Sequence, residues 1–108
     1  TGKTKRESWL LYDIVIRLER MTLIVKEVVW DDFNIAHIGE HDVSVDEVED
    51  ICNGKVDAFL GHSGRFMVIG KTKAGRILSI VLAQKSKGAF YPVTARDASR
   101  KERRWSEK

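Results

Sequence analysis

Three apolar runs in the second half of the chain follow one another so closely that they favour a meander of neighbouring strands. The runs cover residues 64–70, 76–83 and 89–94, and the turns between them are Lys71–Gly75 and Ser86–Gly88. Parallel strands need a crossover of about a dozen or more residues, so turns of this length favour antiparallel pairing.

Pro92 lies inside the third run and cannot donate a hydrogen bond to a strand ladder. We therefore expect an edge position or a bulge at this residue. Tyr91 alternates with Phe90, so one of these two rings should face away from the core. An exposed tyrosine there could stack on a substrate or protonate it.

The first half of the chain predicts a strand followed by a short helix. Residues 22–30 are rich in β-branched side chains, which is typical of a strand. Asp31 or Asp32 then caps a helix that runs to about His41, because a carboxylate accepts the free backbone N–H groups of a first helical turn.

A second helix is predicted directly afterwards. Ser44 and Glu47 form an S-x-x-E capping box, with Val48 at core spacing behind it. Asn53-Gly54 ends this helix in the manner usual for a helix C-terminus.

A basic helix is predicted to close the chain, with Asp97 or Thr94 as its cap. The element order is then β-α-α-β-β-β-α, which indicates a small single α+β domain with helices packed on an antiparallel sheet of about four strands. Met21 opens the first strand-like run, so we assign the domain to residues 21–108. Residues 1–20 are expected to be an N-terminal extension or a segment added for expression; the apolar spacing within them favours a helix, with an added strand as the alternative.

Length and composition fit this assignment. A chain of 108 residues has room for one core, and 43% hydrophobic with 32% charged residues is typical of a globular protein. Cys52 is the only cysteine, which favours a reducing, cytoplasmic setting. No apolar run approaches the roughly 20 residues of a membrane-spanning helix, and no secretory signal is visible.

Charge is strongly segregated along the sequence. Residues 31–57 carry nine acids and one base, whereas residues 58–108 carry twelve bases and three acids, although the whole chain has a net charge of only +3. The basic part suits a phosphate backbone, and the acidic part could repel such a backbone or receive a basic partner. A lopsided but functionless surface is the alternative.

The segment His37–His41 fits the pattern H-x-x-E-H of inverted zinc proteases. A third metal ligand is not evident, however, and Gly39 lies inside the helix, so we expect no metal site. Both histidines could be partly exposed helix residues without a function. Alternatively, one of them could donate or accept a proton near neutral pH.

Basic residues offer two further candidate contacts for phosphate. The turn from Gly70 to Arg76 lacks the Walker pattern, but Lys71 and Arg76 could contact an RNA backbone or serve as solubilising charge. On the last helix, Arg96 and Arg100 lie on an arginine face whose forked donors match phosphate oxygens. Ordinary surface pairs with Asp97 and Glu102 are the alternative for this helix. Trp105 is expected to cover the sheet.

Three motifs in the correct order resemble the BrnT family of bacterial toxins. They are Trp30-Asp31 with His37, His41-Asp42-Val43-Ser44 and Glu47; Val68-Ile69-Gly70-Lys71-Thr72 with Gly75-Arg76-Ile77-Leu78; and Thr94-Ala95-Arg96-Asp97-Ala98 with Glu102-Arg103. The resemblance covers about residues 23–105. It implies a small cytoplasmic ribonuclease with a RelE-like fold, neutralised by a DNA-binding antitoxin encoded beside it.

Two residues depart from the family pattern. Glu40 stands where the family usually has lysine or arginine, and Asp42 stands where it has glycine. A toxin homologue that is weakened towards RNA and acts as a nucleic-acid or protein-binding module is therefore the alternative.

The resemblance implies RNA cleavage without a metal or other cofactor. The ribose 2′-oxygen would attack the adjacent phosphate, with Arg76 and Arg96 as phosphate clamps and His41 as the proton-transfer group. Lys71 and Arg100 are expected to support the RNA backbone, and His37 and Tyr91 are second-line candidates for contact with the substrate. The expected partners are RNA, the antitoxin and a second copy of the chain bound through residues 1–20, where Trp9 and Leu11 need a surface to bury them.

Overall fold

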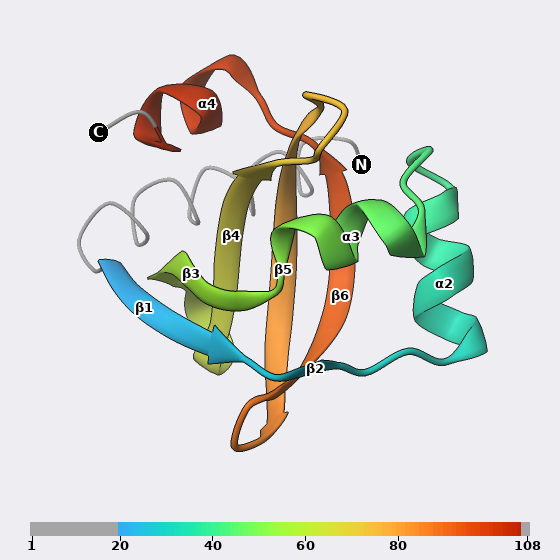
Figure 1. Ribbon diagram of the computed structural model, residues 1–108, viewed down its shortest axis with the longest axis vertical. Coiled ribbons are helices and arrows are strands. Elements are labelled where there is room, and N and C mark those ends of the chain that lie inside the picture. Colours follow the sequence, from blue (N-terminus) through green and yellow to red (C-terminus); the bar gives the residue numbers. More distant parts are fainter. Residues whose placement is uncertain (1–19, 107–108) are drawn as a thin grey trace.

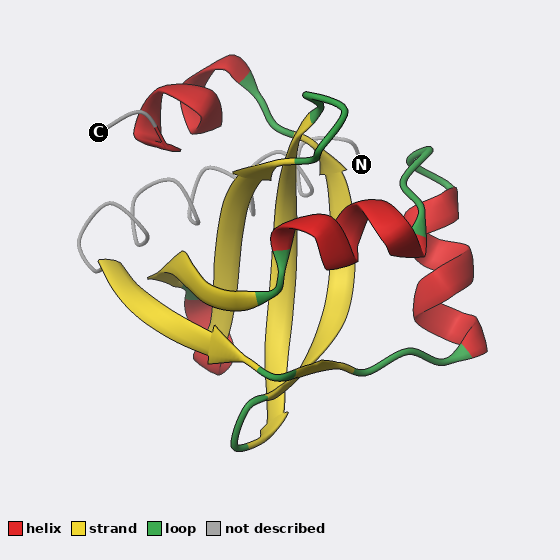
Figure 2. Cartoon of the chain, viewed as in Figure 1, coloured by secondary structure: helices red, strands yellow, loops and turns green. Residues whose placement is uncertain are grey.

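The computed structural model describes residues 20–106 as one small α+β domain (Figures 1 and 2). The expected extension, residues 1–20, falls outside the described residues except for Arg20. In the described part, three α-helices accompany a six-stranded sheet and a 3-10 turn at His62–Gly64. The strands are β1 Arg20–Val25, β2 Glu27–Val28, β3 Gly54–Leu60, β4 Arg65–Lys71, β5 Ile77–Ser86 and β6 Ala89–Asp97; the helices are α2 Asp32–Gly39, α3 Val45–Ile51 and α4 Arg100–Ser106.

The sheet has the strand order β1-β3-β4-β5-β6-β2, and its ends are joined by one continuous segment. Only Lys26 separates β1 from β2, yet these two strands lie at opposite edges of the sheet. The backbone N–H groups of Lys26 and Glu27 both donate to the Gly88 carbonyl, at 2.8 and 3.0 Å. The sheet must therefore curl so that its two edges approach each other (Figure 1).

This topology corrects the expected sheet of about four antiparallel strands. The run 22–30 forms two strands rather than one, and β2 pairs with β6 in parallel. Gly54–Leu60 forms an additional strand that pairs antiparallel with both β1 and β4. The observed order is β-β-α-α-β-β-β-β-α instead of β-α-α-β-β-β-α. The predicted antiparallel meander of β4, β5 and β6 is confirmed.

The first two predicted helix starts are also confirmed. Asp31 accepts a hydrogen bond from the Asn34 backbone N–H at 2.8 Å, and the Asn34 side chain accepts one in return at 2.9 Å. Ser44 and Glu47 form the predicted capping box of α3. The last helix differs, because Asp97 still belongs to β6 and the Ser99 hydroxyl accepts from the Glu102 backbone N–H at 3.1 Å.

Each face of the sheet carries its own core. Helices α2 and α3 cover one face, where Ile38 and Val48 are fully buried against Leu78, Ile80 and other strand residues. On the other face, α4 brings Trp105 against Phe59, Met67 and Val81. The Trp105 ring meets the Phe59 ring edge-on with centroids 6.2 Å apart, so its expected covering role is confirmed.

A bulge in β6 is confirmed at the proline. Val81 pairs with Thr94 and Leu82 pairs with Pro92, which leaves Val93 as the extra residue. Phe90 is buried in the core whereas Tyr91 is half-buried, as their alternation predicts. Within residues 20–106, no helix combines the length and the apolar character that crossing a lipid bilayer requires.

Candidate functional site

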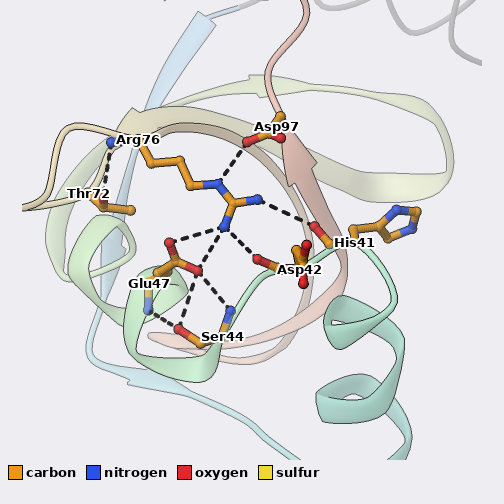
Figure 3. Close-up of polar contacts among 7 residues, drawn as sticks. All are labelled: His41, Asp42, Ser44, Glu47, Thr72, Arg76 and Asp97. Atoms are coloured by element: carbon orange, nitrogen blue, oxygen red, sulfur yellow. Dashed lines mark hydrogen bonds and ion pairs between the residues drawn. The ribbon is translucent and has the colours of Figure 1, made fainter.

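Arg76 lies where four segments of the chain meet, just before β5. Its Nε donates to Asp97 Oδ1 at 2.8 Å, and its Nη1 donates to both Glu47 carboxylate oxygens at 3.1 and 3.2 Å (Figure 3). Nη1 also donates to the Asp42 carbonyl, and Nη2 donates to the His41 carbonyl at 3.4 Å. We call the residues drawn in Figure 3 the Arg76 cluster: His41, Asp42, Ser44, Glu47, Thr72, Arg76 and Asp97.

The tight turn between β4 and β5 fixes the backbone of Arg76. The Thr72 N–H donates to the Arg76 carbonyl at 2.8 Å, and the Thr72 hydroxyl accepts from the Arg76 N–H at 3.0 Å. Gly75 has a φ of 96°, in the left-handed region that glycine adopts without steric cost. The side chain of Arg76 therefore starts from a constrained position rather than from a mobile loop tip.

The loop between α2 and α3 presents backbone carbonyls to Arg76. The N–H groups of His41 and Asp42 donate back to Ile38 and Gly39, which closes the end of α2. Asp42 has a φ of 61°, and Ser44 then begins α3. This reversal directs the carbonyls of His41 and Asp42 towards the guanidinium group (Figure 3).

The charges in the cluster stabilise one another. The hydrogen bond from Arg76 is the main cause that lowers the pKa of Asp97. The pKa of Glu47 is also lowered, first by the hydrogen bond from the Ser44 backbone and then by Arg76. The hydrogen bond to Asp97, with that to Glu47, raises the pKa of Arg76. Arg76 thus carries a full positive charge that two carboxylates already balance.

Arg96 adjoins this cluster through Asp97. Its Nη1 donates to the Asp97 carbonyl at 2.8 Å, and its two terminal nitrogens hold both carboxylate oxygens of Glu102 at 3.1 and 2.9 Å. The Glu102 side chain, only 2% exposed, also accepts from the Ser79 hydroxyl and from the Ser99 backbone, each at 2.8 Å. Burial alone would raise the pKa of Glu102, but the Ser99 hydrogen bond and the Arg96 charge outweigh it and lower the pKa.

The two histidines form a ring pair on the side of α2. The ring centroids of His37 and His41 lie 5.7 Å apart with the planes at 78°. His37 Nδ1 lies 3.9 Å from a Glu40 carboxylate oxygen. The His41 ring points away from Arg76, so the contact of His41 with the arginine is made by its backbone (Figure 3).

The other candidate residues make their contacts outside the Arg76 cluster. Tyr91 donates its hydroxyl to both carboxylate oxygens of Asp31 at 3.1 Å, and Lys85 Nζ lies 5.1 Å from the Tyr91 ring centroid. Desolvation and the neighbouring Asp31 raise the pKa of Tyr91. Lys71 and Arg100 are exposed at the end of β4 and the start of α4. Arg76 therefore meets the His41 backbone carbonyl, and Arg96 adjoins Arg76 only through Asp97 while its side chain binds Glu102. Tyr91 makes its contacts with the start of α2.

The sequence did not predict that three acids form the ion pairs with Arg76 and Arg96. Glu47 was predicted as a capping residue, and Asp97 as a helix cap or as one partner of a surface pair. Glu102, expected in a surface pair, is buried and holds Arg96. The run Ser99-Arg100-Lys101-Glu102 is itself an S-x-x-E pattern, and this signal could have identified both the start of α4 and the inward direction of Glu102.

Metal binding and the thiol of Cys52 are two further possibilities for chemistry. Across residues 20–106, no three His, Cys, Asp or Glu side chains gather closely enough to hold a metal ion. Cys52 is 2% exposed, and burial raises the pKa of its thiol to about 12, so it is a poor nucleophile near neutral pH.

Comparisons of the chain with protein-family models, with curated proteins and with solved structures give no match.

Proposed function

We propose that the protein is a metal-independent endoribonuclease of the toxin type, with a sheet that is a curled variant of the RelE-like fold. The observation that carries the proposal is the convergence of His41, Arg76 and Arg96. These residues come from three motifs far apart in the sequence; Arg76 contacts the Asp97 carboxylate and the His41 backbone carbonyl, and Arg96 contacts the Asp97 backbone carbonyl. Such convergence is what a site built from those motifs requires.

The ring pair suits the proton transfers of the reaction. Attack of the ribose 2′-oxygen on the phosphate needs a base for the 2′-hydroxyl proton and an acid for the leaving 5′-oxygen. His41 and His37 are two imidazoles 5.7 Å apart, one for each role. The products are a 2′,3′-cyclic phosphate and a free 5′-hydroxyl, and no metal takes part.

The arginines supply positive charge near the reacting phosphate. In the contacts of the described residues, Arg76 Nε and Nη1 are occupied by Asp97, Glu47 and a carbonyl, whereas Nη2 donates only to the His41 carbonyl. One Nη2 hydrogen remains to donate to a phosphoryl oxygen next to the His41 carbonyl. Arg100 and Lys71, both exposed, then bind neighbouring phosphates.

The same toxin proposal includes its cellular setting. We infer a cytoplasmic protein that a DNA-binding antitoxin neutralises, in line with the resemblance of its three motifs to BrnT toxins. The acidic residues of α2 and α3 offer a complementary surface to basic side chains of such a partner.

A second candidate is a toxin homologue that binds RNA or protein without cutting. The observation in its favour is the pairing of both arginines: Arg76 with Glu47 and Asp97, and Arg96 with the buried Glu102. A phosphate must compete with these carboxylates, and the competition weakens any clamp. Glu40 adds negative charge beside His37.

Cleavage of a long unstructured RNA in the presence of EDTA tests the proposal. Wild type should cut and leave 2′,3′-cyclic phosphate ends, and His41→Gln should reduce the rate at least about 100-fold because it removes a proton-transfer group. Lys55→Gln, an exposed residue of β3, is the control that should cut normally. RNA binding without any cutting by wild type would favour the second candidate.

A further inference from the structure

Helix α2 carries an unusually exposed aromatic ring beside the proposed site. The Phe33 side chain belongs to a residue that is 76% exposed, far more than Ile35 at 42% on the same helix. The Phe33 and His37 rings lie four residues apart on the helix, with centroids at 6.4 Å and planes within 5° of parallel. The His41 ring continues this row at 5.7 Å from His37.

Phe33 has no part in holding α2 on the sheet. The inward side of the helix is formed by Asn34 and Ile38, both 0% exposed. The Asn34 amide donates to the carbonyls of Val29 and Pro92 at 3.1 and 3.2 Å, which ties α2 to the edge of β6. Phe33 belongs to neither of the two cores. Its ring is therefore available for an external contact.

The charges around the row select the kind of contact. Asp32 and Glu40 lie on the same helix and its end, and Glu40 approaches His37 at 3.9 Å. These acids favour contact through a base, which is neutral and offers a flat π-face, over contact through its phosphate, which the proposed function places at Arg76. An aromatic ring parallel to a neighbouring imidazole is a suitable surface for such a base.

We infer that Phe33 and His37 form a stacking platform for an unpaired base of single-stranded RNA, next to the phosphate cleaved at His41. The inference rests on the proposed function and narrows its substrate to RNA whose base near the cleavage site is unstacked. A paired base in a duplex already uses both of its faces, so duplex RNA should not bind this row.

The test uses short single-stranded RNA in which every ribose is 2′-O-methylated, because such RNA cannot be cleaved by its own 2′-oxygen. Binding of the fluorescent oligonucleotide is measured for wild type, Phe33→Ala, Phe33→Trp and the control Ile35→Ala. A second oligonucleotide set carries one abasic position, moved stepwise along the strand. Phe33→Ala should weaken binding at least about fivefold, Phe33→Trp should retain it, and Ile35→Ala should leave it unchanged. One abasic position should weaken wild-type binding to the same extent and have no further effect on Phe33→Ala.

Cleavage of unmodified RNA, measured in parallel, separates this inference from the proposed function. Cutting by wild type with binding that ignores both Phe33 and the abasic position would overturn the platform while the ribonuclease stands. Binding that depends on Phe33 and on one base, without cutting, would support the platform and overturn the ribonuclease. If the methylated RNA does not bind to wild type, or binds Ile35→Ala as poorly as Phe33→Ala, the platform is overturned and an apolar contact for a protein partner takes its place.

Discussion

Asp97 accepts hydrogen bonds from both arginines of the proposed site. Its carboxylate accepts from Arg76 and its backbone carbonyl accepts from Arg96. The Arg76 hydrogen bond lowers the pKa of Asp97 in the folded state, so folding is stabilised by the ionised form. That contribution is fully present above the pKa of the unfolded chain, about 4, and is lost as the pH falls through the lower folded value.

Asp97→Asn should therefore lower the melting temperature at pH 7 and have a smaller effect at pH 3. The difference should be small, because the Asp97 side chain is 70% exposed and solvent screens the pair. Thermal unfolding followed by circular dichroism between pH 3 and 7 measures it. Asp57→Asn, at an exposed position of β3, removes the same charge elsewhere in the domain and is the control. An Asp97→Asn effect of equal size at both pH values would show that the ion pair is not its cause.

Asp42 occupies a backbone conformation that favours glycine. Its φ of 61° lies in the left-handed region, where a β-carbon costs about 1 kcal/mol. Asp42→Gly should therefore leave the free energy of unfolding unchanged or raise it by up to about 1 kcal/mol, as measured by urea denaturation. The carbonyl that accepts from Arg76 is retained in this variant. Marked destabilisation would mean that the Asp42 carboxylate has a structural role that the contacts do not reveal.

Sequence reasoning selected the cationic residues of the proposed site but not their anionic partners. His41, Arg76 and Arg96 were selected because their side chains suit phosphate chemistry; Arg76 contacts the His41 backbone carbonyl, and Arg96 contacts the Asp97 backbone carbonyl. Their ion pairs with Glu47, Asp97 and Glu102 depend on how β5, β6 and the two helices approach one another. Such tertiary partners leave no periodic signal in a single sequence.

Gly70 determines how closely α3 packs on β4. A β-carbon at this residue would lie 2.5 Å from Ile51 Cγ2, so Gly70→Ala would force the end of α3 away from the strand. We expect a loss of about 1–3 kcal/mol in the free energy of unfolding, measured by urea denaturation.

Gly39→Ala is the matched control for this packing effect. No atom lies within 4 Å of a β-carbon at Gly39, which is helical and exposed. Alanine there should stabilise the protein by up to about 1 kcal/mol, since glycine is the poorer helix former. If both variants lost the same stability, the Ile51 contact would not explain the effect at Gly70.

At the scale of elements, local patterns predicted the meander and the helices α2 and α3. They missed β3, because Gly54 and Asp57 are poor strand formers and the run directly follows a helix end. The division of residues 22–30 into β1 and β2 was also hidden. Both strands share one β-branched run, and only the curl of the sheet sends its two parts to opposite edges.

Glu102 fixes α4 to the sheet, and its removal should detach that helix. Glu102→Ala would leave the Arg96 guanidinium without its bidentate partner and the Ser79 hydroxyl without its acceptor. We expect a loss of about 3–5 kcal/mol in the free energy of unfolding, and a smaller loss for Glu102→Gln, which retains the shape and some of the hydrogen bonds. Urea denaturation measures both. Since Arg96→Ala exposes the same buried carboxylate, loss of RNA cleavage in that variant counts against Arg96 only if its folding is intact.

Taken as a whole, the molecule separates its charges between elements. The acids of residues 31–57 lie on α2, α3 and the segments next to them, whereas α4 and the β4–β5 turn carry much of the basic charge. Under the proposed function, RNA at His41 would extend from a basic surface to the edge of an acidic one. Phosphate binding on the basic surface should raise the affinity of the protein for RNA, and repulsion from the acidic surface should lower it.

Salt dependence of RNA binding distinguishes these two contributions. With the methylated single-stranded RNA, Arg100→Gln should weaken binding and reduce the slope of log K against log salt by roughly 0.7, the value for one phosphate contact on a single strand. Glu40→Gln should strengthen binding most at low salt. It removes the repulsion between Glu40 and the RNA phosphates, and salt screens that repulsion least at low concentration. Lys55→Gln should reproduce the wild-type slope if binding is local to the proposed site, and this control excludes an effect of net charge alone. If all three variants shifted affinity only in proportion to net charge, RNA would be bound by the overall field of the protein and not along a path from α4 to His41.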